Sequence, residues 1–122
     1  MKLNFREMTA LLKVGTAMVL ADGRVDDNES YFLSHEFASF GVPLEDMKKM
    51  TEAAEKMKPS EALAIISLMD DEQKRYVASF LGTIMASDGD IDEKEIALWR
   101  MLTEICDLPI MSIKEAIKYV IN

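Results

Sequence analysis

The chain has 122 residues, of which 49% are apolar, and this is enough to bury the core of one globular domain. It carries 14 Lys and Arg against 22 Asp and Glu, and the resulting net charge of −8 argues against nucleic acid and anionic membrane surfaces as partners. The single cysteine, Cys106, excludes a disulfide within the chain and is typical of a reducing compartment, so we expect a cytoplasmic protein. No run approaches the roughly 18–20 apolar residues of a membrane span, so we expect no membrane insertion.

A first helix is predicted over residues 5–21, where apolar residues recur at helical spacing. Asn4 and Glu7 stand at the two ends of an Asn-x-x-Glu capping box, which is a signal for a helix start. The same signal recurs further along the chain at Asp70 and Gln73, ahead of a second long apolar-periodic segment. A matching helix is therefore predicted there.

An acidic motif follows the first helix and reads Asp-Gly-x-Val-Asp-x-x-Glu over residues 22–29, which we call the first corner. Gly23 can adopt the left-handed conformation that closes a helix. Asp26 is a typical helix N-cap, and Glu29, three residues later, would complete a capping box. The first corner therefore predicts a helix, a tight acidic turn and a second helix.

The motif occurs twice. Residues 88–95, the second corner, read Asp-Gly-x-Ile-Asp-x-x-Glu, and its Gly89 lies 66 residues after Gly23. Asp92 and Glu95 take the places of the N-cap and the third helical residue. The offset extends beyond the motif, because Gly41 and Pro43 match Asp107 and Pro109 at two further predicted helix ends. The chain therefore contains an internal repeat, over residues 3–57 and 69–122.

The predicted fold is all-α, and the whole chain, residues 1–122, forms a single domain. We expect two pseudo-symmetric halves of three helices each, joined by one short helix. Neither half is large enough to bury much core alone, which is why we do not expect two domains. The seven helices are predicted over residues 5–21, 27–40, 44–57, 60–69, 71–87, 93–106 and 110–121.

A doubled helix–Asp-Gly-x-(Val/Ile)-Asp-x-x-Glu–helix unit in a small acidic helical domain resembles the TerB-like family, which is named after a bacterial tellurite-resistance protein. A similar domain forms the N-terminal part of DjlA-type co-chaperones. The resemblance covers nearly the whole chain. It implies that the acidic positions form a metal-binding surface, and carried over to this chain the positions are Asp22, Asp26, Glu29, Asp88, Asp92 and Glu95.

Two interpretations of the acidic positions remain open. Capping alone would explain Asp26, Glu29, Asp92 and Glu95, each at about 0.5–2 kcal/mol. It does not explain Asp22 and Asp88, which follow helix C-termini, where the macrodipole disfavours negative charge. Neither corner is an EF-hand, since alignment on its loop glycine places apolar side chains at the first and third ligand positions. Carboxylates without histidine or thiolate favour a hard cation, namely calcium, magnesium or manganese.

Other chemistry is sparse. His35 is the only histidine, Cys106 ends an apolar helix face and is interpreted as a buried thiol, and Trp99 is interpreted as core. Met47, Met50 and Met57 are a candidate adaptable surface for a partner. No phosphate loop or nucleophile elbow is present. We therefore expect a non-enzymatic TerB-like module of a bacterial stress system, acting through an acidic face that binds a divalent cation; the alternative is a co-chaperone-like scaffold that binds a protein partner without metal.

Overall fold

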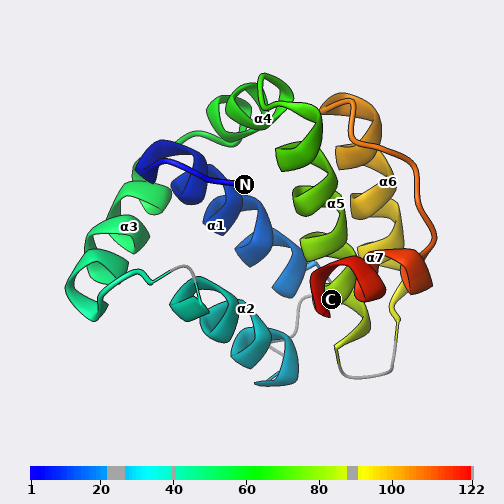
Figure 1. Cartoon of the computed structure of the whole chain (residues 1–122), viewed down its shortest axis with the longest axis horizontal. Helices are drawn as coiled ribbons and strands as arrows, with labels where there is room; N and C mark the ends of the chain where they lie inside the picture. The colour runs from blue at the N-terminus through cyan, green and yellow to red at the C-terminus, as the bar shows by residue number, and fades with distance from the viewer. Residues whose placement is uncertain (22–26, 40, 88–90, 122) are drawn as a thin grey trace.

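A computed structural model describes residues 1–21, 27–39, 41–87 and 91–121 of the chain (Figure 1). Within these ranges it contains seven α-helices and no strand, which confirms the all-α prediction. None of the described helices is both long and apolar enough to cross a bilayer. The helices are α1 (Phe5–Val19), α2 (Asp27–Ser39), α3 (Leu44–Lys56), α4 (Pro59–Ser67), α5 (Asp71–Ala86), α6 (Glu93–Ile105) and α7 (Ile113–Ile121).

The capping boxes that begin α1 and α5 are both formed as predicted. Asn4 accepts a hydrogen bond from the backbone N–H of Glu7 and donates its own backbone N–H to the Glu7 side chain, at 2.8 and 2.9 Å. Asp70 and Gln73 repeat these two bonds at 2.8 and 3.0 Å. Because each box satisfies two of the helix's otherwise unpaired donors, the sequence defines both starts sharply.

The predicted start of the last helix was wrong by three residues. α7 begins at Ile113 and not at 110. Ser112 accepts a hydrogen bond from the backbone N–H of Glu115 at 3.1 Å, and Glu115 accepts one from the backbone N–H of Ser112 at 3.3 Å. This Ser-x-x-Glu capping box fixes the start of α7, whereas the predicted start at 110 follows from Pro109.

The ends of α2 and α6 are followed by residues with positive φ, at Gly41 (75°) and Asp107 (54°), which lie 66 positions apart. Aspartate tolerates this left-handed conformation better than most non-glycine residues. After α6, the backbone N–H of Leu108 bonds to the carbonyl O of Thr103 at 2.9 Å, which is the closing bond of a Schellman motif. The helix stops predicted at these two positions are confirmed.

The centre of the molecule is a pair of helices, α1 and α5, that run in the same direction (Figure 1). Their N-terminal ends meet, because Nε2 of Gln73 donates to Oε2 of Glu7 at 3.2 Å. Towards their C-terminal ends, a Cβ atom placed on Gly15 would lie 3.2 Å from Cε1 of Phe80 and 3.6 Å from Cδ1 of Ile84. The C-terminal ends of α1 and α5 therefore lie at the same end of the pair.

The other five helices surround this pair. α3 and α4 pack on α1, and α7 packs on α5. α2 and α6 each contact both central helices, so the second helix of each half also touches the first helix of the other half. Phe37 of α2, for example, meets Phe80 of α5 edge to face with ring centroids 6.0 Å apart, and both side chains are fully buried. One core is therefore shared by both halves, as expected for a single domain.

Candidate functional site

The six acidic positions predicted as a site fall in the two corners, of which the structure describes only part. Asp22, Asp26 and Asp88 lie outside the described residues. Glu29 belongs to α2, but its side chain lies outside the described part of the chain. The geometry of the site therefore comes from Asp92, from Glu95 and from the helices that lead into the corners.

Asp92 is the N-cap of α6, as predicted. Its backbone is extended, with φ −83° and ψ 142°, and its Oδ1 accepts a hydrogen bond from the backbone N–H of Lys94 at 2.7 Å. This donor belongs to the second residue of the helix, whereas the capping box was expected to use the third residue, Glu95. The Asp92 side chain is half-buried, so capping leaves part of its carboxylate accessible.

Glu95 lies one turn into α6, and only 1% of its surface is exposed. A carboxylate that leaves water loses its hydration, which costs free energy unless nearby dipoles, donors or cations replace the water. The N-terminal end of a helix partly compensates, because its unpaired N–H groups and macrodipole favour negative charge. Glu95 is therefore a buried carboxylate in the first turn of α6, where the helix favours negative charge.

Burial of Glu95 was missed from the sequence, where it was interpreted as an ordinary capping carboxylate. A signal was present, however. Glu95, Trp99 and Leu102 are spaced by four and three residues and occupy one helix face, and these three are the buried residues of α6. An acidic residue on the apolar face of a helix indicates a buried carboxylate.

The arrangement of the central helices brings the described C-terminal ends of α1 and α5 together. α1 leads into the first corner and α5 into the second, and the C-terminal ends of this parallel pair lie together. Free carbonyl groups at such ends are potential oxygen ligands. α6, which carries Asp92 and Glu95, also contacts α1, the helix of the other half. Residues from both halves thus contribute to this end of the fold.

No three described His, Cys, Asp or Glu residues are grouped closely enough to hold a metal ion. This applies to the described ranges alone, and of the six acids those ranges include only two complete side chains, Asp92 and Glu95. Both have oxygen donors, the ligand type that calcium, magnesium and manganese prefer. The chemistry of the described donors therefore fits a hard divalent cation and does not fit a thiolate or imidazole site.

Among the described residues, Tyr76 and Cys106 have raised pKa values, and packing explains both. Burial and the hydrogen bond that the Tyr76 hydroxyl donates to Glu36 at 2.6 Å raise the pKa of Tyr76. Burial also raises the pKa of the Cys106 thiol, against the opposing charge of Lys74. Cys106 is 1% exposed and Trp99 is 8% exposed, which confirms both as core residues. Neither shift points to a reactive nucleophile.

Comparison with known proteins agrees with the fold. The model of the family "Tellurite resistance protein TerB" matches residues 8–117, and the chain belongs to this family. No curated protein matches the chain. Among solved structures, the chain is similar to a protein of unknown function from Porphyromonas gingivalis W83, with 42% sequence identity and a TM-score of 0.89. That match covers 100% of this chain and 92% of the other.

Proposed function

We propose that this TerB-family domain is a non-enzymatic binding module of a bacterial stress-response system of the tellurite-resistance type, working in the cytoplasm. Its binding surface is the end of the fold at which α1 and α5 both end, and its ligand is a divalent cation held by carboxylates from both halves. The observation that carries the proposal is the parallel packing of α1 and α5, the helices that precede the two acidic motifs, with their C-terminal ends at the same end of the pair. We also propose that the two three-helix halves of the chain are related by a pseudo-twofold axis.

Two further observations support a cation. Glu95 is buried to 99% at the start of α6 and places a second carboxylate one turn of helix after Asp92. Asp92 keeps part of its carboxylate accessible although it caps the same helix. Nine of the chain's 22 acidic residues also fall within the two eight-residue corners, which is a costly concentration of charge if nothing neutralises it.

Calorimetric titration of the metal-free chain with calcium, magnesium and manganese tests the proposal. Loose sites built from oxygen ligands bind calcium at about 0.1–1 mM. One ion per chain is expected if the corners share it, and two ions if each corner binds separately. At ten times the dissociation constant, binding should stabilise the fold by about 1.4 kcal/mol, which thermal unfolding would detect.

The variant Asp22→Asn/Asp88→Asn should abolish both the heat of binding and the gain in stability. A matched control, Glu52→Gln/Glu61→Gln, removes the same charge from exposed positions on α3 and α4 and should leave binding unchanged. If several millimolar cation gives neither heat nor stabilisation in the unaltered chain, the cation proposal fails. The acidic end would then be assigned to a protein partner, as in a co-chaperone-like scaffold.

A further inference from the structure

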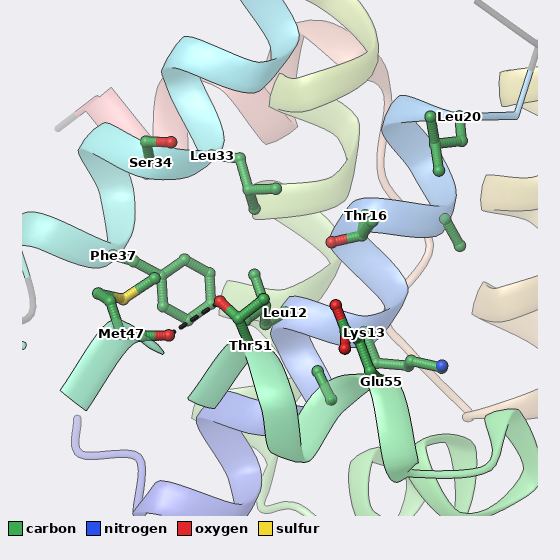
Figure 2. Close-up of a pocket in the computed structure, with 12 residues that line it drawn as sticks. Leu12, Lys13, Thr16, Leu20, Leu33, Ser34, Phe37, Met47, Thr51 and Glu55 are labelled. Carbon is green, nitrogen blue, oxygen red and sulfur yellow. Dashed lines mark hydrogen bonds between the residues drawn. The ribbon is translucent and has the colours of Figure 1, made fainter. Parts of the chain in front are cut away.

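A groove of about 450 Å³ lies between α1, α2 and α3 (Figure 2). Its floor is apolar and buried, formed by Leu12, Phe37 and Ala54. Leu33 and Met47 form its sides. Lys13 and Glu55 are the two charged side chains of the lining, and Thr16, Ser34 and Thr51 contribute hydroxyl groups. Such a groove favours an apolar occupant with little net charge.

The hydroxyl groups near the groove do little to make it polar. Oγ1 of Thr51 donates to the carbonyl O of Met47 within α3 at 2.8 Å (Figure 2), so its hydrogen is already used. Lys13 is only half-buried, and its aliphatic stem can cover apolar surface while its ammonium group stays in water. An occupant would therefore meet mainly carbon.

The second half of the chain shows what fills the corresponding place. A second groove, of about 780 Å³, uses four lining positions that lie 66 residues after lining positions of the first groove: Trp99, Arg100, Thr103 and Ile113 correspond to Leu33, Ser34, Phe37 and Met47. The first groove, however, has four lining residues from α1, whereas none of the lining residues of the second groove comes from α5. Something covers α5 there.

The cover is the indole of Trp99 together with α7. Nε1 of Trp99 donates to the carbonyl O of Ala78 at 3.2 Å, and its Cζ2 would lie 3.1 Å from a Cβ atom on Gly82. Ser79, Gly82 and Thr83 are buried in consequence. Their counterparts on α1, 66 residues earlier, are Lys13, Thr16 and Ala17, and none of these is buried. Leu33 stands where Trp99 would be, and it is too small to cover them.

We infer that the groove between α1, α2 and α3 binds an uncharged small molecule with an apolar, flat ring system of about two fused rings. The expected shape of the ligand follows from Trp99, whose bicyclic side chain covers the corresponding residues of α5, namely Ser79, Gly82 and Thr83. The volume lies within the range of about 300–1,000 Å³ that is typical of small-molecule sites. Two turns of a docked helix, with a diameter of at least about 10 Å, would need roughly 850 Å³. The groove is therefore too small to enclose two turns of a helix.

The test is titration of the full chain with Prodan, a neutral naphthalene fluorophore, in the presence of a chelator so that cation binding plays no part. We expect saturable binding with blue-shifted emission, and displacement by 2-naphthol. Leu33→Trp places in the groove the side chain that fills its counterpart, and it should weaken Prodan binding at least tenfold. Ala17→Leu, which fills the groove from α1, should weaken Prodan binding as well. It provides the test if Leu33→Trp does not fold.

The matched control is Ile110→Ala, which alters the second groove at a side chain that is 94% exposed. It should leave Prodan affinity within twofold of the unaltered chain. The inference is overturned if the unaltered chain shows no saturable binding, if a folded Leu33→Trp or Ala17→Leu variant binds equally well, or if Ile110→Ala is the variant that loses binding. Circular dichroism of each variant confirms that the helices are intact.

Discussion

Gly82 is the position where a single methyl group should disturb the fold most specifically. A Cβ atom there would lie 2.8 Å from Cβ of Ala116 and 3.1 Å from Cζ2 of Trp99. Carbon atoms in contact normally sit about 3.5–4.0 Å apart, so these contacts must open by about 1 Å. Cβ of Ala116 is attached directly to the α7 backbone and cannot rotate away. Gly82→Ala therefore forces α7 to move off α5.

The size of the effect is a difference between two opposing terms. Alanine is favoured over glycine inside a helix by about 1 kcal/mol. Overpacking a close-packed core costs about 1–3 kcal/mol. We therefore expect Gly82→Ala to lower the free energy of unfolding by about 1 kcal/mol, which corresponds to a fall in melting temperature of roughly 3–5 °C for a domain of this size.

Urea denaturation, followed by the fluorescence of Trp99 and by circular dichroism, measures this change. Gly15→Ala is the matched control in α1. Its nearest neighbour would be Cδ1 of Leu33 at 3.0 Å, the tip of a flexible side chain beside the groove, so its cost should be smaller. Ala116→Gly should relieve the clash, so the effects of Gly82→Ala and Ala116→Gly should be clearly non-additive. A Gly82→Ala chain as stable as the unaltered one would refute the reasoning.

Three further predictions concern buried and capping groups. Tyr76→Phe removes the hydrogen bond to Glu36 and should lower the free energy of unfolding by about 1.5 kcal/mol at pH 7. Because the pKa of Tyr76 is raised in the folded state, the unaltered chain should lose stability as pH rises above 10.0. Urea titrations at about pH 9–11 should show a shallower loss of stability for Tyr76→Phe. Asp92→Ala should lower stability by about 1 kcal/mol through the lost cap of α6, measured by thermal unfolding without added cation. Cys106 should react with a disulfide reagent at least about a hundredfold more slowly in the native chain than in urea, and rapid labelling would contradict its burial.

Helix positions could be predicted from the sequence because local chemistry fixes them. Each of these signals depends only on neighbouring residues, and the structure confirms the capping boxes at Asn4 and Asp70 and the left-handed residues Gly41 and Asp107. The start of α7 was equally local, but the prediction relied on Pro109 and neglected the hydroxyl of Ser112, which forms the cap.

The features that were missed depend on which surfaces meet in three dimensions. Helical spacing places Leu33 and Trp99 alike on apolar faces, and only the packing shows that one covers its neighbouring helix and the other leaves a groove. Glu95 was assigned to capping because its distance along the chain from Asp92 suits that role, whereas its burial depends on how α6 meets the core. The sequence identified the six proposed metal ligands, whereas the parallel packing of α1 and α5, the helices that precede the two corners, could be seen only in the structure.

The tight junction at Gly82 also has a consequence for motion. α7 packs on α5 with backbone and ring atoms in close contact, so opening this half exposes much of the core at once. In the other half, the groove separates α2 from α3, and Phe37 and the bond from Tyr76 to Glu36 hold α2 to α5. Amide protons of α2 should therefore exchange through local openings long before those of α5. The half that carries the groove is therefore the one in which the width of the groove can adjust to a bound small molecule.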